Sequence, residues 1–269
     1  MATKKNQDNT QLAVSDAQSK QIMLFDDKNI SVLAATDDYD NMGRADVAVP
    51  FLKVLQALSP ECTPGGPDYK DTARPGMISH SITKQVFQNV VITPVVYKRS
   101  YLEWVPRSKG GGFRGEYSPE THEVIYNQRK DASSGKCTLE NGNDLIETLS
   151  FFSLLHSEDS PPEPVIVSMS STQTKTARQW NQMQQRFIPP GAPMRAYKRC
   201  IANYTFGTDM QRNEKGAWYT WRVLKAITND VDTINMALEF ERQIKGGTIV
   251  VDRSAMEEGS SAFNDSSDM

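Results

Sequence analysis

The stretch that decides the fold is VVITPVVYKRSYLEWVPRSKGGGFRGEY, which covers Val90–Tyr117. It begins with β-branched residues, which predict a strand, and continues as a mixture of aromatic and basic side chains around Gly110–Gly112. Rings and cations on a strand–loop–strand unit are typical of surfaces that bind single-stranded nucleic acid, because bases stack on rings while cations neutralise phosphates. The same pattern fits a half-buried hairpin with an ordinary solvated face, so the rest of the chain has to decide between the two.

The candidate nucleic-acid contacts in this stretch are its aromatic and basic residues. They are Tyr97, Lys98, Arg99, Tyr101, Trp104, Arg107, Lys109, Phe113 and Arg114. Pro94 lacks a backbone N–H and therefore predicts either an edge strand or a bulge. The glycine spacing in GGGFRG matches a dinucleotide-binding fingerprint, but no helical pattern follows it and Ser118-Pro119 predicts a turn. We therefore expect a flexible hairpin loop at these glycines.

A second stretch of the same character predicts a strand over Met194–Gly207 that returns over Ala217–Lys225. Its candidate contacts are Arg195, Tyr197, Lys198, Arg199, Trp218, Tyr219 and Arg222. Trp218 and Trp221 lie on opposite faces if the returning strand is regular. At most one of these two rings is therefore expected to face a ligand, and the other to lie in the core.

The remaining elements follow from hydrophobic periodicity and turn signals. Helical spacing predicts helices over Val49–Leu58, Ser170–Phe187 and Asp230–Lys245. Runs rich in β-branched residues or with alternating polarity predict the strands Met77–Val86, Gln88–Tyr97, Glu123–Tyr126, Leu145–His156, Pro164–Met169 and Thr248–Val251. The predicted fold class is therefore α+β and mainly β.

The polar composition at both ends divides the chain into three parts. Residues 1–45 have few apolar positions and predict a flexible N-terminal arm, while the acidic, Ser-rich residues 253–269 predict a disordered tail. Residues 46–252 between them predict a single β-rich nucleic-acid-binding domain.

The net charge of −3 argues at first against a nucleic-acid partner. The charge is unevenly distributed, however, because residues 173–225 contain 10 basic and 2 acidic side chains, whereas residues 226–269 contain 3 and 9. Fields between exposed charges act within about 10 Å at 0.1 M salt. A locally positive surface can therefore bind phosphates even though the chain as a whole is negative.

Catalytic, metal and membrane signals are missing from the sequence. There is no Walker loop, HExxH or GxSxG motif, and the three Cys and three His residues are scattered, so we expect no enzyme activity, no metal and no cofactor. Glu103 and Glu116 could in principle form a catalytic carboxylate pair, but acids beside a basic strand are more often its ion-pair partners. The longest apolar runs are far shorter than the ~20 residues of a membrane span, and no secretory signal is recognisable. We expect a cytoplasmic protein.

The pattern FLKVLQALSPE, followed by Pro75-Gly76 and then by VVITPVVYKRSYLEWVPR and GGGF, resembles phage-encoded single-stranded DNA-binding proteins over residues 49–117. The resemblance implies an oligonucleotide-binding (OB) β-barrel, here with long insertions, and an acidic C-terminal tail with a Phe near its end. The tail residues that fit are Glu257, Glu258, Phe263, Asp265 and Asp268. The tail departs from that pattern because Phe263 is not terminal and the acids are sparse.

Together these features predict a sequence-independent single-stranded DNA-binding protein of phage replication or recombination, acting in the cytoplasm of the infected host cell. Its expected partners are single-stranded DNA and, through the tail, replication or recombination proteins, with the oligomeric state left open. Two alternatives remain: a structural or assembly protein of the virion, and a regulator that binds a host protein.

Overall fold

The computed structural model describes residues 48–132, 136–158, 160–214, 216–249 and 251–256. The chain divides into two units, residues 1–47 and 48–269, and every described residue belongs to the second. The expected N-terminal arm therefore lies outside the described residues, and so do the tail residues Glu257, Glu258, Phe263, Asp265 and Asp268.

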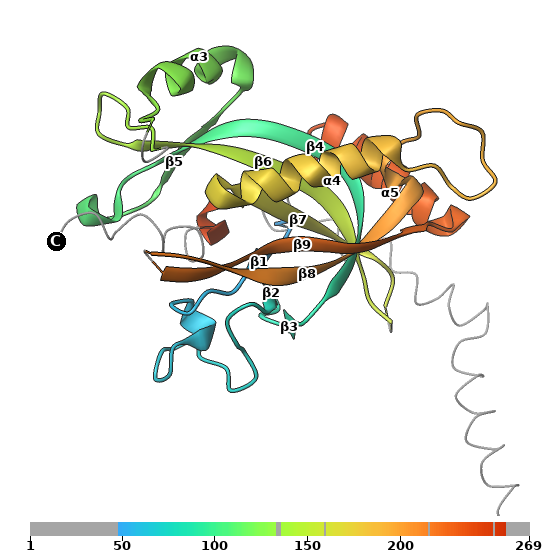
Figure 1. The fold of residues 1–269 in the computed structure, drawn as a ribbon, viewed down its shortest axis with the longest axis horizontal. Helices are drawn as coiled ribbons and strands as arrows, with labels where there is room; N and C mark the ends of the chain where they lie inside the picture. The colour runs from blue at the N-terminus through green and yellow to red at the C-terminus, as the bar shows by residue number, and fades with distance from the viewer. Residues whose placement is uncertain (1–47, 133–135, 159, 215, 250, 257–269) are drawn as a thin grey trace, which may run out of the picture. The chain divides into compact units, whose positions relative to one another are not determined.

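Nine strands of the described residues form one sheet in the order β3-β2-β1-β7-β6-β4-β8-β9, and β5 pairs with the far end of β4. β1 and β7 run parallel, while the other neighbours are antiparallel. The strands are β1 (Phe51–Val54), β2 (Ile78–His80), β3 (Val86–Phe87), β4 (Val90–Trp104), β5 (Phe113–Tyr117), β6 (Asp144–His156), β7 (Glu163–Ser170), β8 (Ala202–Asn213) and β9 (Gly216–Thr228). Figure 1 shows that the sheet is strongly curled into a half-barrel.

β4 is the central strand of this sheet. It pairs with β6 along almost its whole length, with β8 over Val90–Ile92, and with β5 at its far end. The β4–β6 register shifts between Pro94 and Val96, which confirms the bulge expected at the proline. The alternative of an edge strand is wrong, because the bulge already accommodates the missing N–H.

The two faces of the sheet have separate cores, because successive strand residues point to opposite faces. Phe151 and Val167 belong to one apolar cluster, whereas their neighbours Phe152 and Ile166 belong to another. The near-continuous apolar sequences of β6 and β7 are therefore explained by burial on both faces.

Two helices cover these faces. α4 (Thr174–Arg186) covers the first face and inserts the fully buried Trp180 against Phe151 and Phe206, with ring centroids 4.2 and 4.6 Å apart. α5 (Val231–Lys245) covers the second face with Ala237 and Phe240. Figure 1 shows the sheet curling around α4.

A third helix, α3 (Pro119–Arg129), follows β5 and packs Tyr126 against the fully buried Tyr101. Short 3₁₀ turns complete the described elements: η2 (Pro60–Cys62), η3 (Arg107–Lys109), η4 (Ser171–Gln173), η5 (Arg199–Ile201) and η6 (Arg253–Met256).

Side-chain hydrogen bonds, rather than a strand ladder, join β9 to the segment after β1. Gln56 accepts a hydrogen bond from the backbone N–H of Tyr219 and donates one to its carbonyl, both at 2.9 Å, so its amide imitates a neighbouring strand. Thr208 of β8 donates to the carbonyl of Gly76. Gly76 has φ +90° and lies so close to the Tyr219 ring that a Cβ would be 2.5 Å from it, so only glycine fits there.

Most long elements expected from the sequence are confirmed. The strands predicted over residues 88–97, 145–156 and 164–169 correspond to β4, β6 and β7, and the helices predicted over 170–187 and 230–245 correspond to α4 and α5. Asp230 caps α5 by accepting a hydrogen bond from the backbone N–H of Thr233 at 2.7 Å. The strand predicted over 77–86 is divided into β2 and β3.

Four predictions of local structure are wrong. The helix predicted over Val49–Leu58 is the strand β1, which is buried between β2 and β7. The strand predicted over Glu123–Tyr126 lies inside α3, and Ser118-Pro119 begins this helix instead of a turn. In the described part of Thr248–Val251 there is no strand; Ile249 and Val251 pack against the α5 core without pairing.

The fold class is as predicted: mainly β within α+β, with a curled half-barrel sheet of the OB-like kind and three helices in the described residues. No helix in the described part of the chain has the length and apolar character needed to cross a membrane.

Candidate nucleic-acid interface

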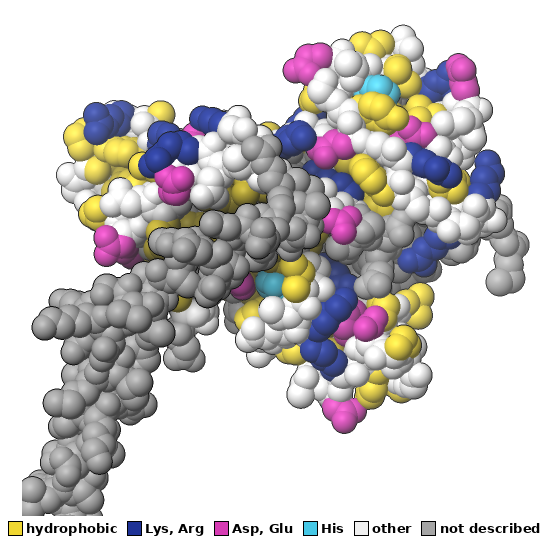
Figure 2. Space-filling model, turned by 180° about the vertical axis from the view of Figure 1, so that it is seen from behind, with side chains coloured by type: hydrophobic (Ala, Val, Ile, Leu, Met, Phe, Trp, Pro, Cys, Tyr) yellow, Lys and Arg dark blue, Asp and Glu magenta, His cyan; other side chains and the backbone are white. Residues whose placement is uncertain are grey.

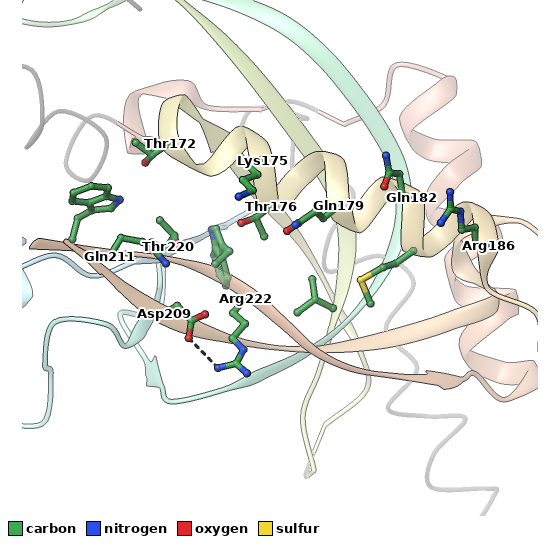
Figure 3. A pocket seen from close by; sticks show the side chains of 14 residues that line it. Thr172, Lys175, Thr176, Gln179, Gln182, Arg186, Asp209, Gln211, Thr220 and Arg222 are labelled. Carbon is green, nitrogen blue, oxygen red and sulfur yellow. Dashed lines mark hydrogen bonds and ion pairs between the residues drawn. The ribbon is translucent and has the colours of Figure 1, made fainter. Parts of the chain in front are cut away.

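A groove of about 560 Å³ runs between α4 and the β8–β9 hairpin. From the helix side it is lined by Thr172, Lys175, Thr176, Gln179, Gln182, Met183 and Arg186, and from the hairpin by Asp209, Gln211, Trp218, Thr220, Trp221, Arg222 and Val223. The helical positions recur every three or four residues and therefore lie on one flank of α4. Figure 3 shows Lys175, Thr176 and Gln179 pointing towards the hairpin.

The groove carries more positive than negative charge. Lys175 and Arg186 are exposed and form no ion pair with any described residue. Arg222 pairs with Asp209 at 3.0 Å, with 57% and 44% of the two side chains exposed. Exposed pairs of this kind are weak, and a guanidinium keeps further donors for a phosphate. Three cations thus line the groove against one acid.

As expected, one of the two tryptophans of β9 is buried in the core and the other is not. Trp221 is buried and packs on Phe206, with ring centroids 5.7 Å apart. Trp218 is half-buried and lines the groove. Tyr219 points to the other face and lies against Gly76, away from the groove. Of the predicted rings on β9, Trp218 thus lines the groove and Tyr219 does not.

A second surface with rings and cations lies at the tip of the β4–β5 hairpin. Trp104 and Phe113 form an edge-to-face pair with centroids 5.3 Å apart, and both are half-buried. Arg107, Lys109 and Arg114 are exposed and form no ion pair with any described residue. We call these five residues the hairpin tip. They are five of the nine contacts that the sequence predicts for the first stretch.

Hydrogen bonds to Glu103 hold the base of the loop that carries the hairpin tip. Its buried carboxylate accepts hydrogen bonds from Tyr117 at 2.7 Å and from the side-chain amides of Asn141 and Asn143. The Tyr117 bond, with support from the Asn bonds, lowers the pKa of Glu103. Gly110, Gly111 and Gly112 then turn the chain through three successive positive φ angles, which other residues rarely adopt.

Tyr101 is not available as a stacking ring, which corrects its place among the candidates. The ring is fully buried against Tyr126, and its hydroxyl accepts a hydrogen bond from Arg99 at 2.8 Å. Tyr97 is half-buried between Phe151, at 5.2 Å, and the guanidinium of Arg199.

The adjacent cations of β4, Lys98 and Arg99, form ion pairs with carboxylates of the same fold. Arg99 pairs with Glu147 at 2.7 Å and with Glu123 at 2.8 Å, and although burial lowers the pKa of Arg99, these acids raise it above its usual value. Lys98, on the opposite face, pairs with Glu116 at 2.9 Å.

The candidates between α4 and β8 do not lie on a strand, because Ala202 begins β8 and the preceding residues form a loop and η5. Lys198 pairs with Glu241 of α5 at 2.6 Å. Arg199 donates hydrogen bonds to Asn181 and Gln184 of α4. Arg195 and Tyr197 pair with each other at 5.3 Å. The strand predicted over Met194–Gly207 is therefore wrong for the residues before Ala202.

Glu103 and Glu116 are ruled out as a carboxylate pair by geometry. Glu116 lies opposite Leu102 in the β4–β5 ladder and Glu103 lies opposite Gly115, so the two acids point to opposite faces. Among the described residues there is also no group of three or more His, Cys, Asp or Glu side chains placed to hold a metal ion.

The expected tail boundary at residue 253 falls within an ordered segment. Arg253 is 3% exposed and pairs with Glu116 at 3.1 Å, and it donates to Ser150 and Ser168 on the neighbouring strands. Burial raises the pKa of Glu116, but Lys98 and Arg253 outweigh this and hold it below its usual value. Arg253, which the sequence assigned to the tail, therefore packs against the sheet.

Sequence reasoning missed the helical side of the groove. Lys175, Gln179, Gln182 and Arg186 form a stripe of polar residues with helical spacing, but no candidate contact was predicted on this helix. The available signal was the absence of acids from this helix, together with its length of 13 residues.

One protein-family model matches residues 19–250, and its description is Pam3 phage gp34-like protein. No curated protein and no solved structure matches the chain. The matched region contains the whole sheet, all three described helices and both surfaces described above. The chain belongs to the Pam3 phage gp34-like family, and it is a phage protein.

Proposed function

We propose that the protein binds single-stranded DNA without sequence preference, in phage DNA replication or recombination, in the cytoplasm of the infected cell. It coats exposed strands and has no catalytic role. The observation that supports this most is the groove between α4 and the β8–β9 hairpin, which is lined by Trp218 together with Lys175, Arg186 and Arg222.

The length of the groove suits an extended strand. α4 has 13 residues, which at 1.5 Å per residue gives about 20 Å. The cations are distributed along this length, so successive phosphates can each find a counter-charge. Stacking of a base on an indole depends little on which base it is, so a contact with Trp218 would give affinity without sequence preference.

The charges on the described part of the opposite side are mixed. Figure 2 shows Lys and Arg side chains mixed with Asp and Glu across the described part of that side. Mixed charges at close spacing cancel beyond a Debye length of about 10 Å. The groove side is therefore the better candidate for a polyanion.

A titration of fluorescently labelled oligo(dT) at 50 and 200 mM salt tests the proposal. The wild-type protein is expected to bind tightly, to lose affinity steeply with salt and to show quenched tryptophan fluorescence. The double variant Lys175→Ala/Arg186→Ala should lower the slope of log K against log salt by about 1.4, because each lost phosphate contact on a single strand contributes about 0.7.

The matched control is Arg242→Ala/Lys245→Ala on α5, which removes the same charge from exposed ion pairs. It should leave the salt slope unchanged. Equal effects of the two variants would contradict a role for the groove. Absent or salt-insensitive binding by the wild-type protein, together with self-assembly, would favour a virion structural role instead.

A further inference from the structure

We infer that each molecule binds two separate single strands, one in the groove and one on the hairpin tip, and so promotes annealing of complementary strands. This inference rests on the proposed function, because it requires that the groove binds single-stranded DNA. It goes further by assigning a second, independent strand to Trp104, Phe113 and the three cations beside them.

The hairpin tip has the chemistry of a strand-binding surface in its own right. Its two rings stay half-exposed although they pair with each other, and its three cations lack carboxylate partners in the described part of the chain. By contrast, Arg99, five residues before Trp104 on the same strand, has two carboxylate partners. Cations without partners are the ones that gain most from a phosphate.

The two surfaces are separated along the sheet. Thr148 of β6 pairs with Ser170, just before α4 begins, and Asp144 of β6 pairs with Trp104 at the tip. Four residues of strand at about 3.3 Å each put Trp104 about 13 Å along the sheet from Ser170, the residue before η4.

An ion-pair network lies on the flank of α4 that faces away from the groove. The groove uses one flank of α4, with Lys175, Gln179 and Arg186, whereas Arg178 and Asn181 belong to the other flank. Arg178 reaches Glu147 at 3.5 Å, and Glu147 and Glu123 bind Arg99.

On this other flank, carboxylates already neutralise the cations. A strand that left the groove over this flank of α4 would pass Glu147 and Glu123, which repel phosphates. The arrangement therefore favours two strands over one continuous strand.

Holding two strands on one molecule has a kinetic consequence. Tethering raises the effective concentration of one strand around the other to the order of millimolar, whereas free strands in an assay are nanomolar. Bringing complementary strands together should therefore become faster when both surfaces are occupied.

Calorimetric titration with (dT)₆ tests the stoichiometry. The wild-type protein should bind two oligonucleotides per chain, and Arg107→Ala/Lys109→Ala should bind one, with the remaining affinity within about twofold of the groove value. The same variant should lose the acceleration of annealing of two complementary 30-mers, which for the wild-type protein we expect to be at least about tenfold over strands alone.

The control for this experiment is again Arg242→Ala/Lys245→Ala, which should keep two sites and full annealing. A wild-type stoichiometry of one, with weaker binding by the tip variant, would show a single strand that spans both surfaces and would overturn the inference while leaving the proposed function standing. No binding of (dT)₆ or of longer oligo(dT) would instead refute the proposed function itself.

Discussion

Lys98 and Arg99 are neighbours in the sequence, yet each is neutralised on a different face of β4, by Glu116 and by Glu147 and Glu123. These partners lie between 18 and 48 residues away, so the local sequence could not reveal them. Arg107 and Lys109 come from the same stretch and form no ion pair with a described residue. Composition thus predicted where rings and cations are concentrated, but the tertiary pairing decides which of them remain available.

His156 gives a prediction at the same scale. Its Nε2 lies 2.8 Å from Oγ1 of Thr93, and this oxygen also accepts a hydrogen bond from Asn229 at 2.9 Å. The imidazole of His156 is thus joined to Asn229 through the Thr93 hydroxyl. Burial lowers the pKa of His156, and the charge of Asp230 offsets this only in part.

The folded state binds a proton on His156 less tightly than the unfolded state does. The stabilisation that neutral His156 gives to the folded state is therefore present above about pH 6.5 and is lost as the pH falls below it. The free energy of unfolding should decrease by at most about 1.4 kcal/mol per pH unit for this one proton. Urea unfolding at pH 7.5, 6.5 and 5.5 measures it. His156→Gln should flatten the decrease, and His122→Gln should not; identical profiles for all three proteins would refute the assignment.

At the scale of elements, the sequence predicted β4, β6, β7, α4 and α5 because each is long and has one clear pattern. β1 was mistaken for a helix because it is buried on both faces between β2 and β7, so its apolar residues do not alternate. α3 was mistaken for a strand because it buries only Tyr126 and has no marked apolar stripe. Its start signal, Ser118-Pro119, is equally typical of a turn and of a helix N-terminus.

The C-terminal segment η6 was not expected to be an element, and its stability can be tested. Arg253 connects η6 to Glu116 on β5 and to Ser150 and Ser168 on β6 and β7, and it lies over the ring of Phe51. Arg253→Met should lower the free energy of unfolding by roughly 3 kcal/mol, because removing one partner leaves a partly buried carboxylate undercompensated.

Lys98→Met is the matched control, since it removes the other cation from the same carboxylate. The Lys98 side chain is 52% exposed, so the loss should stay below about 1 kcal/mol. Chemical denaturation of the three proteins compares them directly. Equal losses for the two variants would contradict the anchoring role of Arg253.

At the scale of the whole molecule, the uneven distribution of charge predicted only part of the positive surface of the groove. The positive block of residues 173–225 supplies Lys175, Arg186 and Arg222 to the groove, but the fold uses Arg178, Lys198 and Arg199 in contacts with other elements. The groove forms because the sheet curls and brings the β8–β9 hairpin beside α4. A single sequence does not show this neighbourhood, because it depends on which strands pair.

Ultraviolet cross-linking of the full-length protein to oligo(dT), followed by tryptic peptide mapping, tests the central claim most directly. The claim is that Trp218 and the cations around it form the contact surface for a single strand. The account predicts cross-links in the peptide Gly216–Arg222, and their loss in Trp218→Ala with binding weakened about 5- to 150-fold, as expected for one stacked base. Cross-links confined to α5 or to the side opposite the groove, with full binding by Trp218→Ala, would contradict it.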